Sequence, residues 1–141
     1  MTKELSIIGD EDTAVIILLS KNRRILFGHR HYKDDSVWTM PGGRCDTRES
    51  LEETLKREVE EETGIKDFII IKFLGKFKGV WKNDVVFVFY GTTNKEYKLI
   101  EPDKFSEWRW ISKEEFIKND KFSGFNPIVR EATIKFIENV S

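Results

Sequence analysis

The sequence predicts a mixed α/β sandwich, with strands in the middle and helices packed on them. Several apolar runs have the length of β-strands and are bounded by turn residues. Three segments carry helix start signals, and two of these also show an apolar repeat at helical spacing. A chain of 141 residues has the size of one domain with its own core, so we expect a single domain over residues 1–141.

The first part of the chain contains three strand candidates. Residues 13–20, TAVIILLS, form a continuous apolar run, and residues 24–31, RILFGHRH, follow after a Lys-Asn-Arg turn. We therefore expect these two segments to form a hairpin. Residues 37–43, VWTMPGG, are predicted to form a short strand that ends in a Pro-Gly-Gly loop signal.

A helix is predicted over about residues 51–63. Ser50 and Glu53 form a capping-box pattern, which marks a helix start. Gly64 marks the end, because Gly adopts the left-handed C′ conformation most easily. An apolar stripe at i, i+4 and i+8 is formed by Leu51, Leu55 and Val59.

Three further strands are expected in the second half. Residues 67–80 are predicted to form a strand that bends at Gly75, and residues 84–93 a second one after a turn at 80–83. Residues 106–112, SEWRWIS, alternate Trp with polar residues and form a short strand.

Two helices are expected near the C-terminus. Residues 112–118 open with the capping-box pair Ser112 and Glu115. Residues 126–140 begin with Asn-Pro at the N-cap and first helical positions. The expected apolar stripe of this last helix, four residues apart, is Ile128, Ala132, Phe136 and Val140.

Acidic residues crowd the end of the helix over 51–63. At about 100° per residue, Glu58 and Glu62 fall within about 20° of Leu51, on the inward face, and Glu61 lies on its flank. Such acids are disfavoured by the helix dipole, by like-charge repulsion and by burial. A divalent cation such as Mg²⁺, which prefers oxygen ligands, would relieve all three effects. The alternative is a solvated acidic face in which Arg57 pairs with Glu61.

The composition and net charge of the chain limit the kinds of partner and cellular location that we expect. Apolar residues make up 39% of the chain and charged residues 35%, which suits a folded protein. With a net charge of −1 we expect no nucleic-acid or anionic-membrane partner. The single cysteine, Cys45, excludes an internal disulfide and suits a reducing cytoplasm as a small free side chain. We find no signal-peptide pattern and no apolar run of membrane-spanning length, so a cytoplasmic location is expected.

A longer pattern extends from Gly43 to Ile65. Gly43 is followed after five residues by Glu49, and after seven more by Arg-Glu-Val-x-Glu-Glu-x-Gly-Ile. This pattern resembles the Nudix box of the Nudix hydrolases at all nine defined positions over 23 residues. A Trp-x-x-Pro-Gly-Gly segment before the box and a late Glu-Trp-x-Trp strand extend the similarity.

The resemblance implies a Nudix α/β/α sandwich with a mixed central sheet. It also implies hydrolysis, with Mg²⁺ or Mn²⁺, of a nucleoside diphosphate linked to another group. Glu49 and Arg57 would hold the geometry of loop and helix by pairing. The metal ligands would be the carboxylates of Glu58, Glu61 and Glu62 and a backbone carbonyl of Gly43.

The reaction implied is attack of water on a pyrophosphate phosphorus, with metal ions screening the phosphate charge and lowering the pKa of a bound water. A carboxylate would take the proton. The acceptor stays open among Glu58, Glu61 and the late-loop acids Glu101, Asp103 and Glu107.

The substrate is expected to be a small nucleotide. Signals of family members that act on ADP-ribose, dinucleoside polyphosphates or coenzyme A are missing. The chain resembles the compact MutT-type members, which hydrolyse (deoxy)nucleoside triphosphates, oxidised purines among them, to monophosphate and pyrophosphate. Asn126 would read the base with Phe122 or Phe125 as a stacking surface, although Asn126 is equally an excellent helix N-cap. Arg30 would bind phosphate, or be an ordinary strand-end arginine.

Three other functions stay open. The chain could hydrolyse a nucleotide sugar, remove pyrophosphate from RNA 5′ ends, or bind a nucleotide as a sensor without cleaving it. The intact box argues against the sensor. Exposed Phe and Trp side chains would serve a homodimer as well as a pocket.

Overall fold

The computed structural model describes residues 12–79, 84–123 and 126–139. The helices and strands follow the predicted order closely. In chain order they are β1 (Thr13–Leu19), β2 (Ile25–His31), β3 (Ser36–Thr39), β4 (Gly42–Arg44), α1 (Leu51–Thr63), β5 (Ile69–Lys78), β6 (Val85–Thr92), β7 (Phe105–Ile111), α2 (Lys113–Lys118), the 3₁₀ helix η2 (Asp120–Ser123) and α3 (Pro127–Asn139).

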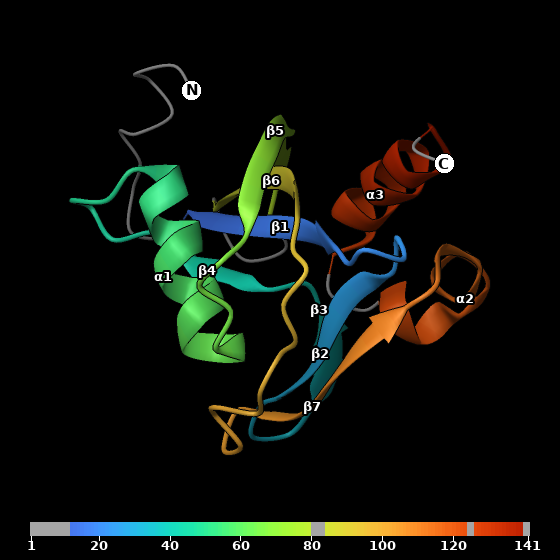
Figure 1. The fold of residues 1–141 in the computed structure, drawn as a ribbon, viewed down its shortest axis with the longest axis horizontal. Coiled ribbons are helices and arrows are strands. Elements are labelled where there is room, and N and C mark those ends of the chain that lie inside the picture. Colours follow the sequence, from blue (N-terminus) through green and yellow to red (C-terminus); the bar gives the residue numbers. More distant parts are fainter. Residues whose placement is uncertain (1–11, 80–83, 124–125, 140–141) are drawn as a thin grey trace.

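The strands form one mixed sheet in the order β3-β2-β1-β6-β5, with β4 paired to β1 and β7 paired to β2. β1 and β6 run parallel, and the other pairs are antiparallel. α1 packs on one side of the sheet, and α2 and α3 contribute to the core on the other side (Figure 1). The predicted α/β/α sandwich is confirmed.

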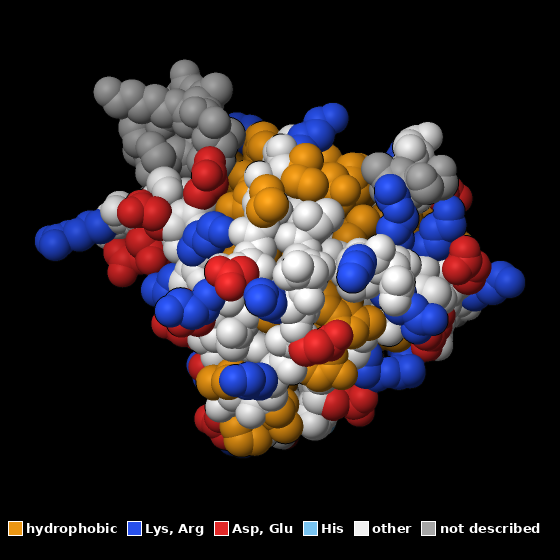
Figure 2. Space-filling model, in the orientation of Figure 1, with side chains coloured by type: hydrophobic (Ala, Val, Ile, Leu, Met, Phe, Trp, Pro, Cys, Tyr) orange, Lys and Arg blue, Asp and Glu red, His pale blue; other side chains and the backbone are white. Residues whose placement is uncertain are grey.

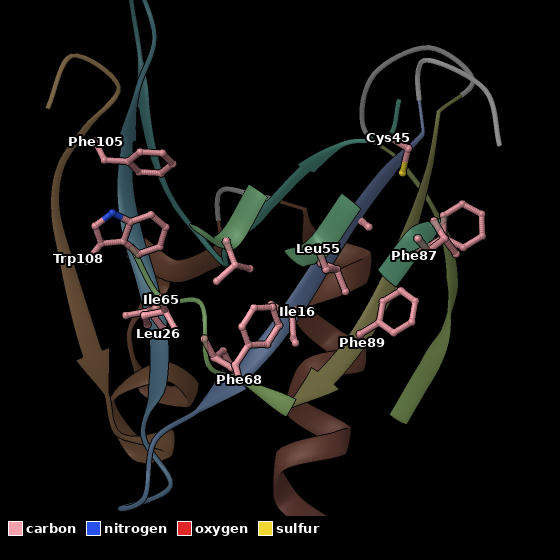
Figure 3. Packing of buried hydrophobic residues seen from close by; sticks show 14 residues of the cluster. Ile16, Leu26, Cys45, Leu55, Ile65, Phe68, Phe87, Phe89, Phe105 and Trp108 are labelled. Atoms are coloured by element: carbon pink, nitrogen blue, oxygen red, sulfur yellow. The ribbon is translucent and has the colours of Figure 1, made fainter. Parts of the chain in front are cut away.

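β1 is the centre of the sheet and is buried on both faces. Ile16 and Leu18 belong to the core under α1, whereas Ile17 and Leu19 belong to the core under α3. This two-sided burial explains why the strand is a continuous apolar run instead of an alternating one. Figure 3 shows the first core, where Leu55 of α1 lies over side chains of the sheet.

The predicted hairpin is correct only at its turn. β1 and β2 pair at Leu19 and Ile25 and then separate. Beyond that point β1 pairs with β6 and β4, while β2 pairs with β3 and β7. The space beside β1 is taken by β4, so Gly42 and Gly43, which we expected in a loop, lie in a short strand.

Gly42 allows β4 to approach β1 closely. Its φ is +148°, and a Cβ added there would lie 2.2 Å from the carbonyl oxygen of Ala14 and 2.7 Å from the Cα of Val15. A residue with a side chain would therefore force the two backbones apart. Gly42, which belongs to a sequence typical of a loop, is instead required for the pairing of β4 with β1.

We expect Gly42→Ala to lower the free energy of unfolding by roughly 2–3 kcal/mol, because it adds both a clash and an unfavourable φ. Urea unfolding of the metal-free protein would measure this loss. Gly64→Ala is the matched control: Gly64 also has positive φ, but its added Cβ would meet nothing nearer than 3.4 Å. It should cost only about 1 kcal/mol, and equal losses in the two variants would contradict a role for close approach.

The inward face of α3 differs from the prediction by one position. Its buried residues are Val129, Thr133 and Ile137, and Ile128 is 49% exposed. Thr133 can be buried because its hydroxyl donates to the carbonyl of Val129 at 2.7 Å. The prediction followed the apolar residues alone and missed this internally satisfied threonine. The last residue of the predicted stripe, Val140, lies outside the described residues.

The remaining elements agree with expectation. β5 shifts register between Phe73 and Gly75, at the predicted bend, and again between Ile70 and Lys72. The turn expected at 80–83 lies outside the described residues. No helix in the described ranges has the length and apolar character needed to cross a membrane.

Candidate active site

α1 begins and ends where its capping residues predict. The Ser50 hydroxyl accepts from the Glu53 N–H at 3.1 Å, and the Glu53 carboxylate accepts from the Ser50 N–H at 2.8 Å. At the other end Gly64 is left-handed and its N–H donates to the carbonyl of Glu60 at 2.9 Å. These caps fix the ends of the helix, and the buried Leu51, Leu55 and Val59 fix its rotation over the sheet and so the direction of each acid.

The acids face as the helical spacing predicts. Glu62 is 8% exposed, the Glu58 side chain is 17% exposed, and the Glu61 side chain is 51% exposed. Burial raises the pKa of Glu58, and it raises that of Glu62 well above the usual glutamate value. The charge of Glu101 adds to both increases. The charges of nearby acids therefore add to the cost of ionising Glu58 and Glu62.

Strand β4 lies against the two inward acids. The Gly42 N–H donates to Glu62 Oε1 at 3.1 Å. A Cβ at Gly43 would lie 2.4 Å from Cδ of Glu58, so this carboxylate packs directly on the glycine backbone. The first glycine of the box thus makes room for an acid fifteen positions further along the chain.

Arg57 connects the loop before α1 to the acids. Its Nε donates to Glu49 Oε2 at 2.7 Å, and its Nη2 donates to Glu49 Oε1 at 3.0 Å. Its Nη1 donates to Glu58 at 2.8 Å and to Glu61 at 3.2 Å. The hydrogen bonds from Arg57 lower the pKa of Glu49 to about 2. The Arg57–Glu61 pair of the solvated-face alternative is therefore present, as part of a larger network.

A cleft of about 710 Å³ opens beside these acids. Arg30 lies at its edge, with its guanidinium 4.5 Å from the centre of the Tyr32 ring and a 2.6 Å hydrogen bond to the carbonyl of His31. Lys104 lines the same cleft, 3.5 Å from the Glu101 carboxylate. Of the predicted site residues, those that line it are Arg30, Gly43, Glu58, Glu61, Glu62, Glu101 and Asn126.

Asn126 also caps α3. Its Oδ1 accepts from the N–H groups of Ile128 and Val129 at 3.0 and 3.1 Å, and its Nδ2 donates to the carbonyl of Lys78 at 3.3 Å. Both acceptor positions of the amide are occupied, and within the described residues its second N–H has no hydrogen-bond partner, in a residue that is 4% exposed.

Several predicted residues lie elsewhere. Asp103 and Glu107 do not line the cleft, and Glu107 lies 4.0 Å from Arg109 on β7. Phe122 is fully buried, where it packs on Phe27, and Phe125 is outside the described residues. Burial raises the pKa of the Cys45 thiol to about 11, which keeps this free cysteine protonated and unreactive at neutral pH.

Sequence reasoning missed part of the cleft. Tyr32, Lys104 and Phe105 line it from loop and strand ends distant in sequence. Arg44 lines it from the end of β4, and Asp84 from the position before β6. No periodicity or local motif marks these residues, because only the pairing of β2 with β7 and of β1 with β4 and β6 brings them together.

The donor set suits a hard divalent cation. Glu58, Glu61 and Glu62 offer carboxylate oxygens beside the backbone of β4, and two of them are held partly out of water with like charges nearby. In the described part of the chain no three His, Cys, Asp or Glu side chains already converge as a cation cage. Arg57 and the Gly42 N–H occupy some of the carboxylate oxygens instead.

We expect Glu62→Gln to raise the melting temperature in EDTA at pH 8 by about 3 °C, equivalent to about 1 kcal/mol. Burial raises the folded-state pKa of Glu62, so its ionised form opposes folding. This cost is absent below about pH 4.5, the ordinary value, and grows as pH rises through the higher folded-state pKa. The gain should therefore shrink at pH 5. An equal gain from Glu60→Gln, an exposed acid on the same helix, would contradict the explanation.

Comparison with known proteins adds family relationships to this geometry. The NUDIX domain model matches residues 10–131. A putative 8-oxo-dGTP diphosphatase of Bacillus subtilis is 31% identical over 99 residues, which cover 70% of this chain and 64% of that protein. An RNA pyrophosphohydrolase of Pelagibacter ubique is 30% identical over 118 residues, covering 70% of this chain and 74% of that one. The crystal structure of a MutT protein from Methanosarcina mazei Go1 superimposes with a TM-score of 0.75 at 25% identity, covering 92% of this chain and 94% of that one.

Proposed function

Since the chain belongs to the Nudix family of hydrolases, we propose that it hydrolyses (deoxy)nucleoside triphosphates, oxidised purine nucleotides among them, to monophosphate and pyrophosphate. The observation that carries this proposal is the cleft, in which three box acids share about 710 Å³ with the cations Arg30 and Lys104. That volume is suited to one nucleotide. The similarity to a putative 8-oxo-dGTP diphosphatase supports the same substrate class.

Glu58, Glu61 and Glu62, with the carbonyl of Gly43, would hold Mg²⁺ or Mn²⁺. When bound, the cation supplies positive charge against the phosphate oxygens and makes water a stronger nucleophile. The charge of the cation would also offset the like-charge repulsion and the desolvation that raise the pKa values of Glu58 and Glu62.

The protein's own residues position the phosphates and take up the proton. Among the other residues that line the cleft, Arg30 and Lys104 bind the phosphate oxygens of the substrate. Arg57 and Glu49 hold Glu58 and Glu61 in place through the hydrogen bonds described above. The proton of the attacking water passes to a carboxylate of the cleft, and the candidate acceptors that line it are Glu58, Glu61 and Glu101.

Asn126 contributes to base choice through its one remaining N–H. Because both lone pairs of its amide oxygen accept helix N–H groups, it can donate to a base but cannot accept from one. A keto oxygen, as on guanine, suits this donor, whereas the amino group of adenine does not. We therefore propose a preference for guanine-type over adenine-type triphosphates, with Phe125 kept as a proposed stacking surface.

A second candidate is removal of pyrophosphate from RNA 5′ ends. The chemistry is the same, because the bond cut lies in a 5′-triphosphate. This candidate is favoured by the similarity to RNA pyrophosphohydrolases, that of Pelagibacter ubique among them. The two differ only in whether the ribose 3′ oxygen carries a further nucleotide.

A product-release assay separates these candidates. The panel would hold the standard NTPs and dNTPs, 8-oxo-dGTP, ADP-ribose, a dinucleoside polyphosphate, GDP-sugars and a 5′-triphosphorylated RNA, each with Mg²⁺ and with EDTA. We expect Mg²⁺-dependent release of pyrophosphate, fastest from guanine-type triphosphates. Turnover confined to linked diphosphates would overturn the substrate proposal, and tight nucleotide binding without any product would indicate a sensor.

A further inference from the structure

A second concave region lies at the opposite end of β1 and β6 from the cleft. The cleft is lined by the first residues of these parallel strands, among them Thr13 and Val86. Two hollows of about 630 and 340 Å³ are lined by their last residues or by the turn that follows β1, and they share Leu19 and Arg23. Six residue steps along β1, about 20 Å, separate the two ends. We call the two adjoining hollows the basic groove.

The basic groove is rich in uncompensated positive charge. Its acids are Asp67 and Glu114. Its cations are Lys21, Arg23, Arg24, Lys56, Lys66 and Lys113. Within the described residues, the one ion pair that any of these six cations forms is a 3.9 Å contact between Lys66 and Glu60. Figure 2 shows Lys and Arg side chains across the middle of one face and gathered near the turn between β1 and β2 of Figure 1. This concentration contrasts with the net charge of −1 for the whole chain.

Parts of the basic groove are rigidly built. The Lys56 Nζ donates to the carbonyl of Phe68 at 2.5 Å and lies 4.0 Å from the centre of its ring. Arg23 adopts a left-handed φ of +61°, a conformation that costs a non-glycine residue about 1 kcal/mol or more. The tight turn that contains it is closed by hydrogen bonds between the backbones of Ser20 and Arg24 and of Arg23 and Ser20, each 2.9 Å. Arginine in place of Asn or Gly at this position adds charge to the groove at the expense of local stability.

We propose that the basic groove binds a single strand of nucleic acid through its phosphates. A mononucleotide would occupy one hollow and contact only part of the array, whereas a strand carries one phosphate per nucleotide and can contact cations in both hollows. Electrostatic binding of this kind needs no base recognition, because Lys and Arg side chains that contact phosphates do not read the sequence. Our expectation of no nucleic-acid partner rested on net charge, which averages an acidic cleft with a basic groove.

The test uses an eight-nucleotide single-stranded RNA with a 5′-hydroxyl, which the cleft cannot hydrolyse. Its binding to the full-length protein is followed by fluorescence anisotropy in EDTA across a series of salt concentrations. We expect measurable binding at low salt, with log K falling against log salt by about 0.7 for each phosphate contacted. The double variant Lys21→Glu, Lys66→Glu should weaken binding at least tenfold and reduce the slope by about 1.4.

The double variant Lys76→Glu, Lys135→Glu is the control, since it changes net charge equally at exposed lysines outside the groove. An equal loss in this control would overturn the proposal, as would absence of RNA binding. Competition by GMP at the same concentration of phosphate groups would also overturn it, by assigning a mononucleotide site. Mg²⁺-dependent turnover of nucleoside triphosphates should be unchanged in the groove variant. A failure of the RNA-binding proposal can therefore be told apart from a failure of the proposed function.

Discussion

Glu61→Gln is expected to lower kcat/KM for the preferred nucleoside triphosphate by about 10³-fold, equivalent to roughly 4 kcal/mol of transition-state stabilisation. Glu61 is the most exposed of the three box acids, and its one hydrogen bond to another described side chain is a 3.2 Å contact from Arg57. Its carboxylate is therefore free to bind a cation and adds little to folding. Gln keeps the size and one acceptor oxygen but removes the charge that the proposed metal site requires.

Three measurements make this prediction specific. Steady-state kinetics with saturating Mg²⁺ give the loss, and thermal unfolding in EDTA should show a folded variant with unchanged or raised stability. Glu60→Gln, one position earlier and pointing to solvent, should retain activity near that of the parent. Near-normal turnover in both Glu61→Gln and Glu62→Gln would disprove the assignment of these acids to the metal.

The direction in which these acids point could be predicted because the sequence determines both the ends of the helix and the face that it buries. Ser50 and Gly64 fix the ends, and Leu51, Leu55 and Val59 fix the rotation. Given those, the spacing of 100° per residue places each glutamate. The observed order of exposure, Glu62 below Glu58 below Glu61, agrees with that calculation.

Features that depend on distant pairing could not be predicted in the same way. Gly42 was expected in a loop because a Pro-Gly-Gly segment usually is one, yet its missing side chain lets β4 lie on β1. Lys104 and Tyr32 join the cleft from different parts of the chain. On α3, the buried face includes Thr133, whose hydroxyl is satisfied within the helix, so apolar spacing alone gave the wrong stripe.

Arg57→Lys is expected to reduce kcat by about 10²-fold with a smaller change in KM, because the charge remains and the geometry is lost. The guanidinium contacts Glu49 through two nitrogens and also reaches Glu58 and Glu61. A single lysine Nζ cannot span these carboxylates. Glu58, already partly buried, would keep its desolvation and lose its hydrogen bond from Arg57. Arg48→Lys, at a neighbouring loop position with an exposed side chain, is the matched control and should change neither parameter.

Stability against acid gives a readout that a purely catalytic role would not change. The pKa of Glu49 is lowered to about 2, chiefly by its hydrogen bonds from Arg57. A lowered folded-state pKa contributes stability that is fully present above about pH 4.5 and is lost as pH falls toward 2. In Arg57→Lys the pKa of Glu49 should return toward the ordinary value, so the variant loses roughly 1–2 kcal/mol at neutral pH and its stability depends less on pH over that acid range. A variant that loses activity but keeps the parent's acid profile would show that Arg57 acts on the substrate, and not by holding the loop and helix together.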